Sequence, residues 1–105
     1  MDKYIVVVTL CNNEDVAHRI INGVLRNHLA AGSQMNKVHS KYYWKSGLEE
    51  CDEYKIEFRT KLSLFDDIKK EIEKYHDYET AEITSYEILS ANKEIIEWIE
   101  NNTKW

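Results

Sequence analysis

The strongest constraint on the fold is the order in which strand-like and helix-like hydrophobic patterns follow one another along 105 residues. The first pattern, Tyr4 to Leu10, is rich in β-branched residues and apolar on both faces, which indicates a buried central strand. From Val16 to Ala30 apolar residues recur every three or four positions, which predicts an amphipathic helix that stops near Gly32. The polar residues 12–15 between the two are expected to cap this helix.

A long hairpin is predicted next. Met35 to Trp44 has the composition of a strand, and Lys45-Ser46-Gly47 is a turn signal. Between Glu53 and Lys61 apolar and charged residues alternate strictly, which is typical of a strand with one buried face. The buried face would carry Tyr54, Ile56 and Phe58.

The last third of the chain repeats the helix-then-strand order. Ser63 and Asp66 resemble a capping box, so we expect a helix capped by Ser63 that buries Leu64, Phe65, Ile68, Ile72 and Tyr75. Residues 82–89 read as a fourth strand. Ser90 is then expected to cap a final helix whose apolar side carries Ile95, Ile96, Trp98 and Ile99.

The resulting order, β-α-β-β-α-β plus one helix, predicts a single α+β domain over residues 1–105. It matches the ferredoxin-like arrangement, in which two helices cover one face of an antiparallel sheet. The other face needs cover, and the extra helix and a second subunit are the candidates.

Composition excludes several classes of partner. The net charge of -5 argues against nucleic acid, which is bound by basic surfaces. No stretch approaches the roughly 20 apolar residues that span a bilayer, so no membrane partner is expected. Two cysteines make no disulfide framework, and the first strand lacks the features of a signal peptide. We therefore expect a cytoplasmic protein.

Two residues are candidate metal ligands. Cys11 ends the first strand, where it is either a buried structural residue or a soft ligand for Cu(I) or another thiophilic metal. His76 ends the second helix, close to Asp77 and three further polar residues, Tyr78, Glu79 and Glu82. Imidazole and carboxylates so close together suit a divalent cation or a polar ligand. The alternative is a structural histidine.

An enzyme is not expected. The chain has no Gly-rich phosphate loop, no Gly-x-Ser-x-Gly elbow and no His-Glu-x-x-His motif. The loop after the first strand carries Glu14 and Asp15, which would repel the phosphate that an acylphosphatase of the same fold must bind.

A series of short segments resembles the CutA family of divalent-cation tolerance proteins across nearly the whole chain. The segments are Val8-Thr9-Leu10-Cys11, Leu29-Ala30-Ala31, Ser40-Lys41-Tyr42-Tyr43-Trp44, Glu53, Arg59-Thr60, His76-x-Tyr78-Glu79-x-x-Glu82, and Asn92 six residues before Trp98. Gly32 stands where many members have Cys, and Asp77 replaces the Pro of a His-Pro-Tyr motif. Gly47 falls one position later than the usual glycine. The chain is therefore expected to be better equipped to assemble than to chelate copper.

The resemblance implies a ferredoxin-like homotrimer, similar in architecture to PII-type signalling proteins, with a role in divalent metal (copper) tolerance and no catalytic turnover. No cofactor is required, and copper or another divalent cation is the candidate ligand. Six residues are expected near clefts between subunits: Trp44, Glu53, Arg59, Tyr78, Glu82 and Trp98. They would either lock the trimer or form a pocket for a small metabolite, and a trimeric scaffold that anchors another protein is a third alternative.

Overall fold

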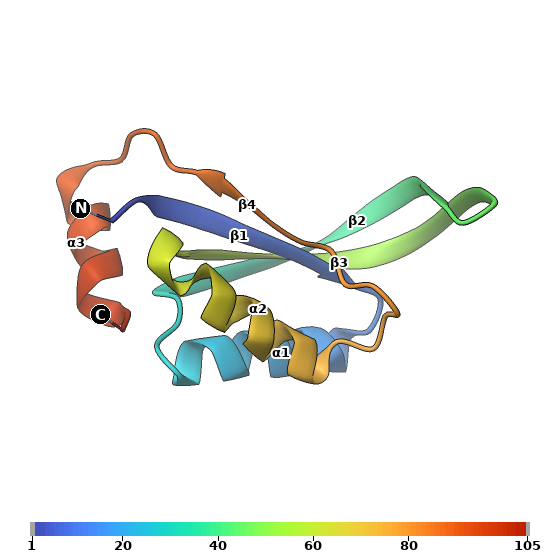
Figure 1. Ribbon diagram of the computed structural model, residues 1–105, viewed down its shortest axis with the longest axis horizontal. Helices are drawn as coiled ribbons and strands as arrows, with labels where there is room; N and C mark the ends of the chain where they lie inside the picture. The colour runs from blue at the N-terminus through green and yellow to red at the C-terminus, as the bar shows by residue number, and fades with distance from the viewer. Residues whose placement is uncertain (1, 105) are drawn as a thin grey trace.

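Four strands form one antiparallel sheet in the computed structural model, which describes residues 2–104 (Figure 1). In chain order the elements are β1 (Tyr4–Cys11), α1 (Glu14–Arg26), β2 (Gly32–Trp44), β3 (Gly47–Lys61), the 3-10 turn η1 (Leu62–Leu64), α2 (Phe65–Tyr75), β4 (Ile83–Glu87) and α3 (Lys93–Asn102). The strands lie in the order β2-β3-β1-β4. This confirms the predicted ferredoxin-like α+β fold.

The hydrophobic core lies between the sheet and the helix layer formed by α1 and α2. Alternate residues of β1, among them Ile5 and Val7, face this layer together with Ile56 and Phe58 of β3. The fully buried Ile20 is one of the α1 residues that complete the core. The strict alternation of β3 and the helical periodicity of α1 therefore predicted the buried faces correctly.

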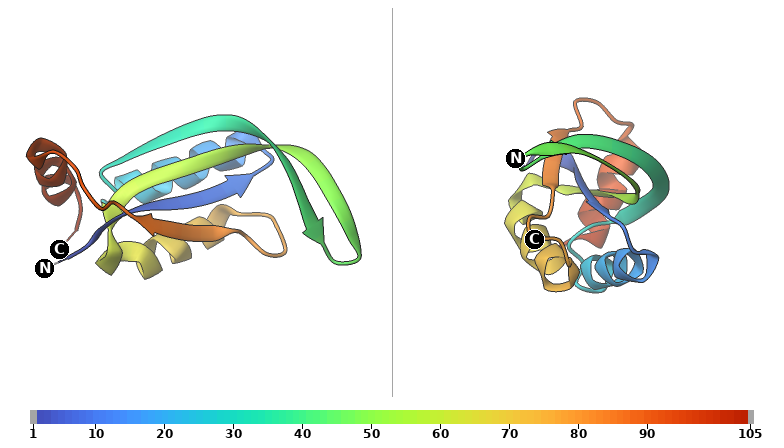
Figure 2. Two further views of the ribbon diagram at one scale, coloured as in Figure 1. Left: turned by 90° about the horizontal axis from the view of Figure 1, so that it is seen from above. Right: turned by 90° about the vertical axis from the view of Figure 1, so that its right-hand side faces the viewer.

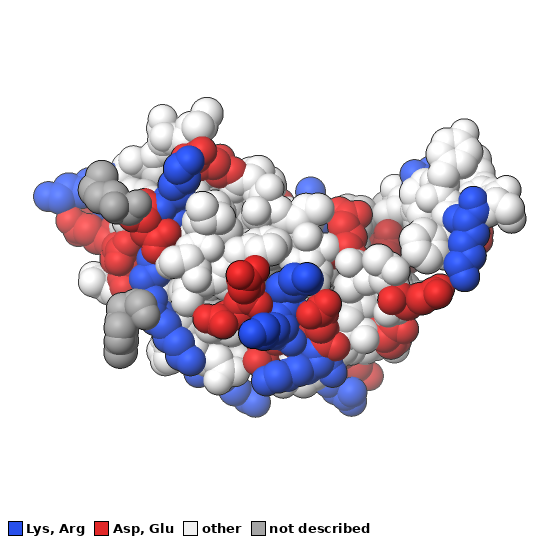
Figure 3. All heavy atoms as spheres, in the orientation of Figure 1, with Lys and Arg blue, Asp and Glu red and all other residues white. Residues whose placement is uncertain are grey.

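The opposite face of the sheet is covered only at one end, by α3. Tyr4 donates a hydrogen bond to Glu100 at 2.6 Å, and the Lys61 ammonium lies 3.7 Å from the same carboxylate. At this end Trp98 packs over Gly32 so closely that a Cβ atom at Gly32 would lie 2.6 Å from the indole ring. The rest of this face is hollowed between α3 and the hairpin (Figure 3). None of the helices within residues 2–104 is long and apolar enough to cross a membrane.

The β2–β3 hairpin projects beyond the helix layer as an arm, which we define as residues 39–52 (Figures 1 and 2). It makes the molecule elongated, with extents of 44 × 26 × 21 Å. β3 begins at Gly47 and not at Glu53, because residues 47–52 pair with residues 39–44 up to the turn at Lys45 and Ser46. Residues 47–52 are rich in acidic side chains, and cross-strand pairs of opposite charge, such as Lys41 with Glu50, stabilise them as part of β3.

Two predicted helix caps are wrong. Ser63 lies inside η1, and its backbone N–H and side-chain hydroxyl both donate to the carboxylate of Asp2. The helix α2 starts two residues later, and no side chain caps it. Ser90 lies outside α3, whose N-cap is Asn92. The predicted cap of α1 is confirmed, since the Asn13 side chain accepts a hydrogen bond from the Val16 N–H at 3.1 Å.

Three predicted element ends also differ from the structure. α1 ends at Arg26 and not at Ala30, because His28 adopts a left-handed conformation with φ 54°. Gly32 is consequently the first residue of β2 and not part of the helix stop. β4 is limited to residues 83–87, the stretch that pairs with β1.

We expect Gly23→Ala to destabilise the protein although alanine favours helices over glycine by about 1 kcal/mol. A Cβ atom at Gly23 would lie 2.9 Å from the Tyr75 ring and 2.6 Å from the buried Glu71 carboxylate. Overpacking of this kind costs about 1–3 kcal/mol, so urea denaturation should show a lower free energy of unfolding. Asn22→Ala on the exposed side of the same helix is the control and should be neutral or slightly stabilising. A stabilised Gly23→Ala variant would contradict the close packing of α1 on α2.

Candidate functional site

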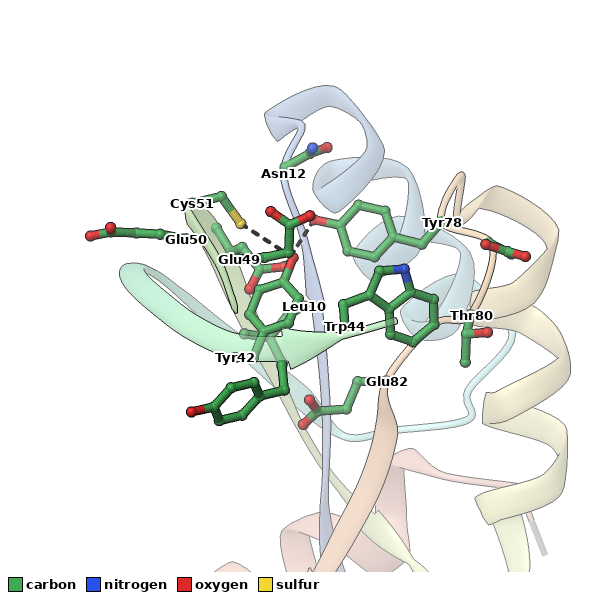
Figure 4. Close-up of a pocket in the computed structure, with 13 residues that line it drawn as sticks. Leu10, Asn12, Tyr42, Trp44, Glu49, Glu50, Cys51, Tyr78, Thr80 and Glu82 are labelled. Carbon is green, nitrogen blue, oxygen red and sulfur yellow. Dashed lines mark hydrogen bonds between the residues drawn. The ribbon is translucent and has the colours of Figure 1, made fainter. Parts of the chain in front are cut away.

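A cleft of about 660 Å³ lies where the arm meets the end of β1 and the segment that leads into β4 (Figure 4). Its lining is aromatic and acidic, and it comes from four segments of the chain: Leu10 and Asn12; Tyr42, Tyr43 and Trp44; Glu49, Glu50, Cys51 and Glu53; and Tyr78, Glu79, Thr80 and Glu82. Pockets of this size and mixed character commonly hold small molecules.

His76 fixes the geometry of one wall of the cleft. Its Nε2 donates to the carbonyl oxygen of Leu10 at 2.6 Å, and its Nδ1 accepts the N–H of Tyr78 at 3.2 Å. The two rings pack edge to face with centroids 4.6 Å apart. Since a metal ion would need a free ring lone pair, these two hydrogen bonds leave His76 no free nitrogen. His76 is therefore a positioning residue for Tyr78 in this structure.

Glu53 is the most buried charged residue of the cleft, with 6% of its surface exposed. The Tyr78 hydroxyl donates to Glu53 Oε2 at 2.8 Å, an interaction drawn as the dashed line at Tyr78 in Figure 4. Burial, and then the neighbouring Glu53 carboxylate, raise the pKa of Tyr78 far above its usual value. Tyr78 is consequently a permanent hydrogen-bond donor, and Glu53 is held as an acceptor facing the cleft.

Cys11 is fully buried beneath the cleft and does not line it. Its thiol donates to the backbone oxygen of Asn13 at 3.5 Å, and burial raises the pKa of this thiol, which disfavours the thiolate that binds metals. Within residues 2–104 no three His, Cys, Asp or Glu side chains are grouped so that they could hold a metal ion. The metal role expected for Cys11 and His76 therefore stays a prediction.

Four of the six residues expected near clefts between subunits line this cleft of the single chain: Trp44, Glu53, Tyr78 and Glu82. Their position between subunits stays a prediction. The other two lie elsewhere. Arg59 is on the open face of the sheet, 3.5 Å from Glu57, and Trp98 of α3 packs on Gly32. Glu49 and Glu50 were not expected at the site because the sequence pattern placed the start of β3 too late. Tyr42 was expected in β2 but not at the site.

Comparison with known proteins identifies the family. The family model described as CutA1 divalent ion tolerance protein matches residues 5–102. The chain belongs to the CutA1 family. A probable divalent-cation tolerance protein from Encephalitozoon cuniculi is 35% identical over 74% of this chain and 68% of its own length. Human Protein CutA is 30% identical over 90% of this chain, which spans about half (53%) of the human sequence.

Solved structures of CutA1 proteins have the same fold. The divalent cation tolerance protein from Thermus thermophilus superposes with a TM-score of 0.92 over 96% of this chain and 99% of its own, at 26% identity. CutA1 from Pyrococcus horikoshii has a TM-score of 0.89 over 96% of this chain and 99% of its own, at 22% identity. At Gly32 of this CutA1 chain a Cβ atom would lie 2.6 Å from the Trp98 indole, so a cysteine at this position would require the ring to shift.

An exposed charge cluster on the arm generates a prediction about pH. His39 Nδ1 lies 2.7 Å from Asp52, and Nε2 contacts Glu50. Because both carboxylates accept, both ring nitrogens must donate, which requires the imidazolium. The hydrogen bonds to Asp52 and then Glu50 raise the pKa of His39.

We therefore expect the ring protons of His39 to titrate by NMR with a midpoint above the ordinary value of about 6.5. The cluster stabilises the fold fully below the unfolded pKa and loses this effect as pH rises through the raised folded pKa. In Asp52→Asn the midpoint should fall back toward the ordinary value. A wild-type midpoint at or below about 6.5 would show that the cluster does not form.

Proposed function

We propose that this CutA1-family chain is a non-enzymatic homotrimer that acts in divalent metal tolerance, in the cytoplasm. The metal tolerance role is supported by the names of its relatives, which describe tolerance and not a reaction. The observation that supports assembly is the exposure of large apolar side chains on the arm, which projects from the body of the molecule (Figure 1). Tyr43 is 85% exposed and Leu48 is 63% exposed.

The arm is suited to bind a second copy of this chain. A hairpin that projects from its own core gains little from burial within one protomer, so its apolar side chains need cover from outside. The sheet order also leaves one edge of β2 and one edge of β4 without a partner strand among the described residues. Unpaired edges are ready sites for strand addition. The number three rests on the family resemblance.

A second candidate function is supported by the cleft, whose buried Glu53 and aromatic walls are typical of a small-molecule site. In this alternative the trimer is a PII-like sensor that responds to a metabolite. Any direct binding of copper at Cys11 or His76 is proposed to be weak, because it must displace the hydrogen bonds that both side chains already make.

Light scattering after size-exclusion chromatography tests the assembly. We expect a mass three times that of the 12.5 kDa protomer, persisting on dilution to nanomolar protein. The double variant Tyr43→Ser, Leu48→Ser should dissociate at a protein concentration at least tenfold higher than wild type, since each lost side chain contributes about 1.5–3 kcal/mol when buried. His18→Ser, on the exposed side of the helix layer, is the control and should assemble like wild type. A monomeric wild type at micromolar concentration would refute the trimer.

A further inference from the structure

All the charged residues that line the cleft are acidic. Its lining contains five glutamates and, among residues 2–104, no Lys, Arg or His. Two of the five are neutralised at the rim, where Glu50 contacts Lys41 and His39, and Glu79 lies 3.1 Å from Lys45. The other three, Glu49, Glu53 and Glu82, make no ion pair with any described residue.

Glu53 is the glutamate of the cleft that is best placed to pair with a positive group. Its side chain is more than nine-tenths buried, and only Oε2 receives a hydrogen bond, from Tyr78. Its other oxygen, Oε1, accepts no hydrogen bond from the described residues, and it is not among their fully buried unpartnered atoms, so it is open to the cleft. A buried carboxylate is costly unless a counter-charge and hydrogen-bond donors satisfy it. The protein supplies a donor to Oε2 and no ion-pair partner among the described residues, so the oxygen that is open to the cleft is available to a cationic ligand.

The walls of the cleft decide which kind of cation fits. The aromatic residues Tyr42, Tyr43, Trp44 and Tyr78 line the cleft together with the carboxylates. A hydrated metal ion needs several oxygen ligands converging on one point, and the cleft offers no such group among residues 2–104. An organic ammonium instead gains from aromatic faces through cation–π attraction, while its carbon chain packs against them.

We propose that the cleft binds a linear polyamine, with one ammonium at Glu53 and another at Glu82. In the view of Figure 4 the indole of Trp44 lies between the labelled side chains of Tyr78 and Glu82, and it offers an alkyl chain an aromatic surface on which to pack. The volume of about 660 Å³ is sufficient for a flexible chain with two or three ammonium groups. The inference rests on the proposed role of the same cleft as a ligand site, and requires that the cleft stays open in the assembled protein.

Calorimetric titration of the full chain with spermidine in about 0.15 M salt, where long-range attraction is screened, tests this inference. We expect saturable binding that Glu53→Gln weakens by about tenfold or more, since the amide keeps the hydrogen bond from Tyr78 but loses the charge. Glu82→Gln, at an exposed position with little effect on folding, should weaken binding severalfold. Glu73→Gln on the exposed face of α2 removes the same net charge and should leave binding unchanged.

Two comparison ligands exclude general attraction to an acidic protein. Magnesium chloride and a neutral alkanediol should neither bind in the cleft nor compete with spermidine. The inference is overturned if spermidine does not bind at millimolar concentration, if magnesium competes equally, or if Glu53→Gln and Glu73→Gln behave alike.

The ammonium group in the cleft could belong to a polyamine or to a lysine of a neighbouring copy. Light scattering of the same variants distinguishes these two sources. If a lysine of a neighbouring copy fills the cleft, spermidine will not bind, and Glu53→Gln will lower the mass of the assembly. That outcome would refute the inference that the cleft binds a polyamine, but it would be consistent with the proposed trimer. A monomer that binds spermidine would instead refute the trimer and leave the cleft assignment intact.

Discussion

The geometry of the cleft depends on a chain of three hydrogen bonds that starts at the end of β1. The Leu10 carbonyl oxygen accepts from His76, the other nitrogen of His76 accepts the backbone N–H of Tyr78, and the Tyr78 hydroxyl donates to Glu53. This chain ties the end of α2 to two strands that are distant in sequence. It fixes the segment leading into β4 and holds one carboxylate in a buried position. Glu53 has no ion-pair partner among residues 2–104, so its charge is available to a ligand or a partner.

The molecule divides its surfaces between two tasks. The body buries a conventional core between sheet and helices, and α3 closes one end of the open face through Tyr4, Glu100 and Trp98. The arm carries exposed aromatic and aliphatic residues that the protomer cannot bury by itself. At position 32 the absence of a side chain lets Trp98 of α3 pack directly on the backbone of β2.

The sequence correctly predicted the buried faces of strands and helices, which depend on local periodicity. It did not predict features that are determined by contacts between residues distant in the chain. The alternation from Tyr54 to Phe58 and the stripe of α1 indicated the right faces, because burial acts on every second or every third to fourth residue. The cap at Ser63 failed because its hydroxyl binds Asp2, a partner 61 positions away. The family resemblance singled out Trp44, Glu53, Tyr78 and Glu82, which line the cleft. It did not single out the other aromatic and acidic residues of the lining, such as Tyr42, Glu49 and Glu50. That surface forms only when residues 47–52 pair with β2. The sequence did not predict this pairing, because residues 47–52 are rich in acidic residues, which have low strand propensity.

The central claim is that a largely buried carboxylate, without an ion-pair partner among residues 2–104, makes this cleft a site for an organic cation in an assembled protein. A crystal structure of the protein grown with spermidine tests it most directly. The account predicts a trimer with elongated density along Trp44 and an ammonium nitrogen within hydrogen-bond distance of Glu53 Oε1. A cleft filled by side chains of a neighbouring copy, or a metal ion bound at Glu53 in place of the polyamine, would contradict it.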